Sequence, residues 1–139
     1  MPPGRGSVAR ILEERARERE RLLGLARDYV ERLSKRVTVV AAAVAGSVAR
    51  GDFNVWSDVD VVVVAEGLPG RIPDRMSVLV ADAPAGVQPV GFTPGEFRTA
   101  WVKGNPLVNE AVRAGVVLTG NEFVATLAGS DRSEEGEVT

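Results

Sequence analysis

The sequence predicts one small α/β domain of the α+β kind, with a mixed sheet of three to four strands and helices mainly on one face. Three observations lead to this prediction. The chain has 139 residues, the usual size of a single domain, and 45% of them are apolar. Short valine-rich runs alternate with segments in which apolar residues recur every three or four positions. Glycine, proline and asparagine separate these segments, as is typical of turns.

The composition excludes several kinds of site. The chain has no cysteine and no histidine, so disulfides, thiolate or imidazole metal ligands and histidine bases are ruled out. Any metal must be bound by oxygen atoms, which favours Mg²⁺. No apolar run approaches the roughly 20 residues of a membrane-spanning helix, and the first residues do not resemble a secretory signal. We therefore expect a cytoplasmic protein without a membrane segment.

The first expected element is a long helix that Ser7 caps and that ends near Lys35. Apolar residues within 22–33 recur at helical spacing, so this half should pack on the core. Residues 13–21 are charged nearly all round the predicted helix, so residues 1–21 should project from the domain. Residues 1–36 carry ten basic and six acidic groups. Because these charges interleave along the helix, direct nucleic-acid binding is not expected.

Two apolar runs predict buried strands on either side of a short helix. Residues 37–45 form the first strand, which ends at Gly46. A short helical turn follows and ends at Gly51, a residue type typical of helix C-termini. Residues 59–65 form the second strand. The sequence therefore predicts a strand, a helix and a strand in succession.

The next elements are a short helix, a strand and a second helix. Residues 74–81 fit helical spacing and also strand alternation, and we favour the helix. Residues 87–92 predict a strand. Thr93, followed by a proline and by Glu96, has the pattern of a capping box, which predicts a helix over 94–103.

The chain should close with one more helix and one short strand. Asn105 and the proline after it predict a helix that ends near residue 114, and residues 116–118 predict a final strand. Residues 125–139 are rich in glycine, serine and glutamate and predict a disordered acidic tail. We therefore place the domain at residues 1–124.

The residues that indicate chemistry are Gly46 and Ser47, followed after ten residues by Asp58 and Asp60. Side chains two apart in a strand face the same side, so the two aspartates should project together. Neighbouring carboxylates at the start of a buried strand repel each other unless a cation or hydrogen-bond donors lie between them. A divalent metal ion is the most economical explanation.

The start of the short helix predicts a phosphate-binding turn. Gly46 lets the backbone approach a ligand, and Ser47 adds a hydroxyl to the free N–H groups of the helix start. Arg50, one turn on, can reach the same phosphates or pair with Asp52, and the sequence favours neither. Trp56 could stack on a base or cover an edge of the core.

Together these residues resemble the signature of the DNA polymerase β-type nucleotidyltransferases. The match is to the minimal nucleotidyltransferases (MNT), which are the antitoxin half of HEPN/MNT pairs, and it covers roughly residues 20–120. The residues that carry it are Gly46-Ser47, Ala49-Arg50-Gly51, Ser57-Asp58-Val59-Asp60, Gly91-Phe92-Thr93-Pro94-Gly95-Glu96-Phe97, Lys103-Gly104-Asn105-Pro106 and Gly115-Val116-Val117-Leu118.

The resemblance implies the transfer of a nucleoside monophosphate, AMP from ATP in characterised pairs, to a hydroxyl group. Two Mg²⁺ ions held by Asp58 and Asp60 would bind the triphosphate, and Ser47 would contact its outer phosphates. The acceptor in such pairs is a tyrosine of the HEPN partner. The short chain implies an open, shallow cleft, so we expect a helical HEPN-type protein to complete it.

One position departs from the family pattern. The superfamily has a third carboxylate on the strand predicted at 87–92, where alignment places Gln88. An amide oxygen can bind a metal ion, but it cannot accept a proton at neutral pH. Asp82 could substitute for the missing carboxylate, or it could be an ordinary solvated loop residue. The alternative function is therefore a non-catalytic, nucleotide-binding antitoxin with a degenerate site.

Overall fold

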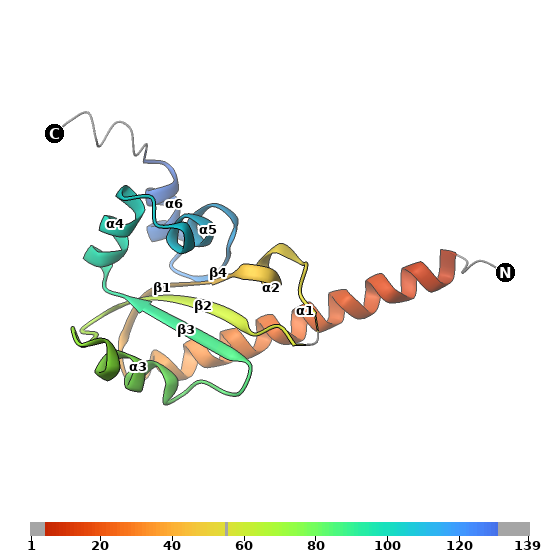
Figure 1. Cartoon of the computed structure of the whole chain (residues 1–139), viewed down its shortest axis with the longest axis horizontal. Coiled ribbons are helices and arrows are strands. Elements are labelled where there is room, and N and C mark those ends of the chain that lie inside the picture. The colour runs from red at the N-terminus through yellow and green to blue at the C-terminus, as the bar shows by residue number, and fades with distance from the viewer. Residues whose placement is uncertain (1–4, 55, 131–139) are drawn as a thin grey trace.

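The computed structural model describes residues 5–54 and 56–130. In this part of the chain four strands form one mixed sheet in the order β3-β2-β1-β4 (Figure 1). β1 (Thr38–Ala45) pairs antiparallel with β2 (Val59–Glu66) and with β4 (Val116–Thr119). β2 pairs in parallel with β3 (Val87–Phe92). The predicted fold class, an α/β domain on a mixed sheet, is confirmed.

Helices cover both faces of this sheet (Figure 1). α1 (Arg5–Leu33) and α3 (Ile72–Val80) lie on one face. α4 (Pro94–Val102), α5 (Pro106–Ala114) and α6 (Asn121–Ala128) lie on the other. The expected placement of the helices mainly on one face is therefore wrong. Because β1 and β2 are apolar on both faces, each face needs a covering layer.

α1 packs on the sheet through its C-terminal half, as predicted. Its buried side chains recur at helical spacing: Leu22, Leu23, Ala26, Tyr29, Val30 and Leu33. Its N-terminal end extends beyond the sheet (Figure 1). Contact with the domain nevertheless includes Arg15, which donates hydrogen bonds to the backbone carbonyl oxygens of Gly51 and Phe53. The projecting part is therefore shorter than the expected 1–21, because arginine side chains reach several ångströms from the helix axis.

The helices α4 and α5 begin at the predicted caps. Thr93 and Glu96 form a reciprocal capping box, in which each side chain accepts a hydrogen bond from the other residue's backbone N–H (3.2 and 2.8 Å). The Asn105 side chain accepts from the N–H of Val108 at 3.1 Å. Local sequence was sufficient to find both helix starts.

The helix α6 corrects the predicted boundary of the tail. The sequence predicted disorder from residue 125, but α6 continues to Ala128. Val124 and Leu127, three residues apart, are both buried against the sheet face that α4 and α5 also cover. The domain therefore extends past residue 124. The remaining part of the predicted tail, residues 131–139, lies outside the described residues.

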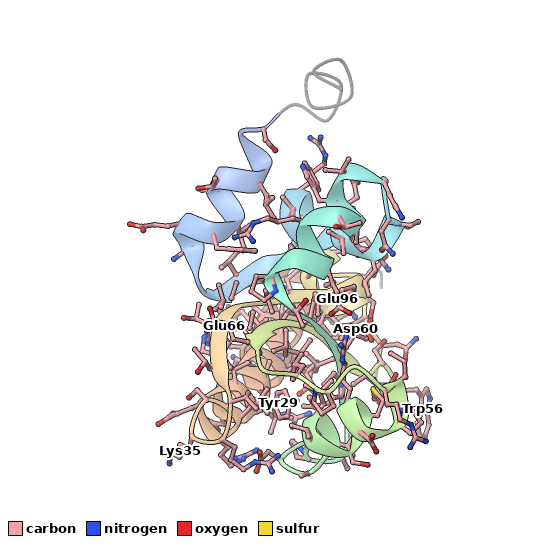
Figure 2. The ribbon with its side chains drawn as sticks, turned by 90° about the vertical axis from the view of Figure 1, so that its left-hand side faces the viewer. Tyr29, Lys35, Trp56, Asp60, Glu66 and Glu96 are labelled. Atoms are coloured by element: carbon pink, nitrogen blue, oxygen red, sulfur yellow. The ribbon has the colours of Figure 1, made fainter. Side chains whose placement is uncertain are left out.

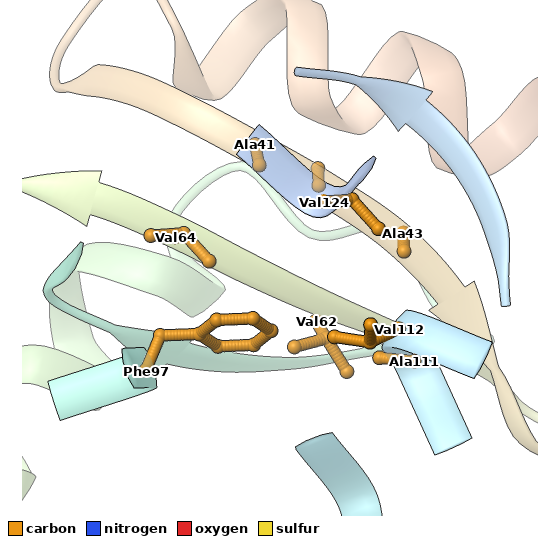
Figure 3. A pocket seen from close by; sticks show the side chains of 9 residues that line it. Ala41, Ala43, Val62, Val64, Phe97, Ala111, Val112 and Val124 are labelled. Carbon is orange, nitrogen blue, oxygen red and sulfur yellow. The ribbon is translucent and has the colours of Figure 1, made fainter. Parts of the chain in front are cut away.

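A small apolar void lies between the sheet and the helices α4–α6 (Figure 3). Its volume of about 10 Å³ is at the lower limit for one water molecule. It is lined by Ala41, Ala42, Ala43, Val62, Val64, Phe97, Ala111, Val112 and Val124, which offer a water or polar ligand no side-chain partner. It is a gap in packing, and the functional site has to be sought elsewhere. No described helix is long and apolar enough to span a membrane.

Candidate functional site

The predicted acidic pair lies at the N-terminal end of β2. Asp58 precedes the strand and is exposed, whereas Asp60 is its second residue and is partly buried. Burial raises the pKa of the Asp60 carboxyl, and the negative charges of Asp58 and Glu110 raise this pKa further, while Arg50 lowers it. The carboxylate of Asp60 is therefore in a region with excess negative charge, which a bound cation would relieve.

Gly46 lies directly beside this carboxylate. Ala45, the last residue of β1, is the antiparallel partner of Asp60, so Gly46 follows at the same edge of the sheet. Its φ is +71°, a conformation that L side chains rarely adopt. A Cβ atom at Gly46 would also collide with a carboxylate oxygen of Asp60. The glycine therefore leaves free the space between the phosphate-binding turn and the acidic pair.

Two arginines of α1 hold the turn in place. Arg19 donates to the carbonyl oxygens of residues 48 and 49 (2.9 and 3.0 Å), near the C-terminus of α2 (Gly46–Arg50). Arg15 donates to those of Gly51 and Phe53 (3.0 and 2.9 Å). Carbonyls at the end of a helix lack partners within it, and cations there oppose the negative end of its dipole. The half of α1 expected to project thus fixes α2 and the loop after it.

Arg50 is paired with two carboxylates. It donates to Asp52 at 3.2 Å and to Glu110 of α5 at 2.8 Å. The structure thus contains the predicted pairing with Asp52, and the phosphate-binding role of Arg50 stays a prediction. Glu110 also accepts the backbone N–H of Gly46 at 2.8 Å. Sequence reasoning missed Glu110 because it is 64 positions from Gly46 and carries no motif.

Gln88 is next to Asp60 on the neighbouring strand. β2 and β3 are parallel, and Asp60 and Gln88 are paired in their register. Paired residues on adjacent strands project from the same face of a sheet, so Gln88 is where the family alignment expects the third carboxylate. Its side chain is exposed. One end of the sheet therefore brings together Gly46, which follows β1, with Asp60 of β2 and Gln88 of β3.

Comparison with known proteins identifies the domain. Residues 25–104 match the family described as the nucleotidyltransferase domain, which is more than half of the chain. The chain belongs to this nucleotidyltransferase family. The matched segment includes the predicted phosphate-binding turn at Gly46 and Ser47, the acidic pair and Gln88.

The fold of this nucleotidyltransferase domain also occurs in a solved structure. The crystal structure of a candidate nucleotidyltransferase from Sulfolobus solfataricus superimposes with a TM-score of 0.58. The aligned part covers 84% of this chain and 89% of that one, at 21% sequence identity. At this identity the likeness shows the shared fold. Among curated proteins no sequence matches the chain.

The oxygen atoms of the nucleotidyltransferase site suit a hard divalent cation. Asp58 and Asp60 supply carboxylates and Gln88 an amide, the kinds of ligand that Mg²⁺ takes in proteins. Within residues 5–54 and 56–130 no group of three or more acidic residues is close enough to hold a metal ion. An ion bound here would therefore have at most two carboxylate ligands, and water, phosphate or amide oxygens would complete its coordination.

The structure also places two further candidate residues, Asp82 and Trp56. Asp82 does not reach the site, because it pairs with Arg36 at 2.8 Å near the opposite end of β1. It cannot replace the third carboxylate from there. Trp56 is 88% exposed and points outward from the loop before β2 (Figure 2), so it does not cover the core. The stacking role that the sequence left open for Trp56 stays a prediction.

Proposed function

We propose that this domain transfers a nucleoside monophosphate, AMP from ATP, to a hydroxyl acceptor in a Mg²⁺-dependent reaction. The observation that carries the proposal is the contact between Gly46 and Asp60, which sets a phosphate-binding turn against an acidic pair with no side chain between them. A triphosphate that carries a divalent cation matches this arrangement, because its anionic and cationic parts both find partners.

The roles of the residues follow from their positions. The N–H groups at the start of α2 and the Ser47 hydroxyl would bind the outer phosphates, with Arg50 as a further cation. Asp58 and Asp60 would hold Mg²⁺, and Gln88 would offer its amide oxygen. When bound, the metal would neutralise charge on the triphosphate. The chain itself mainly positions the reacting groups.

The subtype and the acceptor rest on the sequence resemblance. We propose that the chain is a minimal nucleotidyltransferase whose acceptor is a tyrosine of a HEPN-type helical partner, and that the pair acts in the cytoplasm. The open setting of the site supports this, because the side chains of Asp58 and Gln88 are both exposed. A partner would then supply both the missing wall of the site and the acceptor.

The test is a transfer assay with labelled ATP, Mg²⁺ and a candidate HEPN-type partner protein. We expect a covalent label on the partner and release of pyrophosphate. The variant Asp58→Asn/Asp60→Asn should lose both, whereas Asp28→Asn, which changes an exposed carboxylate on α1, should retain them. Equal labelling by the double variant would show that the acidic pair is not the site.

Gln88 supports a second candidate function, a nucleotide-binding antitoxin that acts by contact without catalysis. In that case the protein would bind Mg-ATP and the partner but release no pyrophosphate. Gln88→Glu separates the two. If only the missing base limits the chemistry, transfer should rise by roughly 10²-fold, the low end of what a positioned general base contributes. If the protein acts by contact alone, Gln88→Glu should bind Mg²⁺ more tightly but should still transfer no nucleotide.

A further inference from the structure

The two hydrogen-bond donors that would bind a substrate phosphate are both bonded to one carboxylate. The backbone N–H of Gly46 and the Nη1 of Arg50 both donate to the same carboxylate oxygen of Glu110, each at 2.8 Å. An N–H at a helix start and a guanidinium group are both typical partners of phosphate oxygens. The Glu110 carboxylate thus occupies the position in which the proposed function would place a phosphate of the substrate.

The charges around Glu110 indicate that this carboxylate can be displaced. Glu110 accepts a hydrogen bond from Gly46, which lies directly against the carboxylate of Asp60, so Glu110 adds another negative charge beside the acidic pair. Arg50 would keep Asp52 as a partner if Glu110 left. The Glu110 side chain is 31% exposed and comes from α5, so it can turn into solvent without opening the core.

We propose that Glu110 is an internal anion that occupies the phosphate position of the resting site and leaves it when the triphosphate binds. The proposal rests on the function proposed above and adds a residue that sets its nucleotide affinity. An anionic ligand that arrives without a cation is repelled by the carboxylates of Asp58, Asp60 and Glu110. It also finds the two donors already bonded to Glu110. A triphosphate with Mg²⁺ brings its own cation to Asp58 and Asp60 and offers stronger acceptors to Gly46 and Arg50.

The expected size of the effect follows from competition inside the molecule. If Glu110 occupies the donors in about nine of ten molecules, the apparent affinity for nucleotide is reduced about tenfold relative to an open site. Removal of the Glu110 carboxylate should therefore raise the apparent affinity for nucleotide about tenfold. A residue that only supported the turn would have the opposite effect, because its loss would leave Gly46 and Arg50 less well placed and weaken binding.

The experiment is calorimetric titration of the full chain with Mg-ATP. Glu110→Ala should bind about tenfold more tightly than the parent. Glu110→Gln should also bind more tightly, but by less, because its amide oxygen still accepts from Gly46 without a charge. The control Glu122→Ala removes one charge from an exposed position on α6 and should match the parent within about twofold. Thermal unfolding of each variant verifies that it folds.

The outcomes separate this inference from the proposed function. If the parent binds Mg-ATP, Gly46→Val does not, and both Glu110 variants bind equally or more weakly, the internal anion is refuted while the site itself stands. Unchanged affinity in Gly46→Val would remove the phosphate-binding turn and, with it, both proposals. Tighter binding by Glu110→Ala and Glu110→Gln, with Glu122→Ala unchanged, supports the inference.

Discussion

Two acidic side chains that Figure 2 labels, Glu96 of α4 and Asp60 of β2, have opposite electrostatic surroundings. The Arg75 guanidinium and the N–H of Thr93 hold the pKa of the Glu96 carboxyl below its ordinary value. Burial and the charges of Asp58 and Glu110 raise the pKa of Asp60 above its ordinary value. The protein supplies partners for one carboxylate and accumulates like charge around the other.

The comparison separates a structural carboxylate, Glu96, from one that we propose to be functional, Asp60. Arg75 is 5% exposed, and it joins Glu96 to the carbonyl oxygens of Pro69 and Gly91, so the pair ties α4 to α3 and β3. The surroundings of Asp60 are unfavourable for the chain alone and become favourable only with a cation. Glu96, although part of the motif that resembles the family, is thus explained by the fold.

The largest effect on stability is expected when the ion pair between Arg75 and Glu96 is broken. Arg75→Ala should lower the free energy of unfolding by about 2 to 3 kcal/mol, because it leaves the buried carbonyl of Gly91 and the Glu96 carboxylate without their partner. Chemical denaturation measures this difference. Arg71→Ala is the control, since its 3.9 Å contact with Asp74 is exposed, and it should change the value by no more than about 0.5 kcal/mol. Equal effects of the two variants would contradict a structural role for Arg75.

A side chain at Gly46 should have an effect of similar size on stability. Gly46→Ala places a side chain on a left-handed backbone and makes it collide with Asp60. We therefore expect the free energy of unfolding to fall by about 2 to 3 kcal/mol. Gly51→Ala is a matched control, because its φ is +86° and an added Cβ would meet no described atom within 4 Å. It should cost only about 1 kcal/mol of backbone strain. The difference between the two, measured by chemical denaturation, isolates the contact with Asp60.

Removing the unsatisfied charge should stabilise the metal-free protein. Asp60→Asn keeps the size of the side chain and ends its repulsion by Asp58 and Glu110, so we expect a gain of up to about 1 kcal/mol after allowance for solvent screening. Thermal unfolding in a chelating buffer measures it. Millimolar Mg²⁺ should then stabilise the parent and leave the variant unchanged. A variant less stable than the parent in chelator would show that Asp60 has partners within the fold.

The smallest effects concern pH. The pKa of Glu96 is lowered in the folded state, so its contribution to stability is present above its ordinary value of 4.5 and is lost as the pH falls through the folded pKa. The pKa of Asp60 is raised, so its penalty is present at neutral pH and disappears as the pH falls through the raised pKa towards 3.8.

Melting temperatures of the parent, Glu96→Gln and Asp60→Asn between about pH 3 and pH 8 measure both effects. In metal-free buffer the two variants should differ from the parent in opposite directions at neutral pH, and both differences should shrink in acid. The same sign for both differences at neutral pH would contradict the comparison.

Much of the fold was predictable because its signals are local. The strands at 37–45, 59–65 and 87–92 are short valine-rich runs, and Thr93 with Glu96 fixes a helix start within four residues. α6 was missed because the composition around residues 125–130 resembles a tail, and only packing of Val124 and Leu127 on the sheet reveals the helix. The covering of both faces was missed because periodicity alone does not show which helix packs on which face.

The sequence by itself determined the fold class, the family resemblance and the residues Gly46, Asp58, Asp60 and Gln88, because each lies in or beside a locally recognisable motif. Only the tertiary structure brought Arg15 and Arg19 to the carbonyls of α2 and Glu110 to Gly46 and Arg50. These partners are between 29 and 64 positions apart along the chain. Charged side chains on a helix are usually solvated, so their partners are set by the packing of α1 and α5 against the sheet, which no local pattern records.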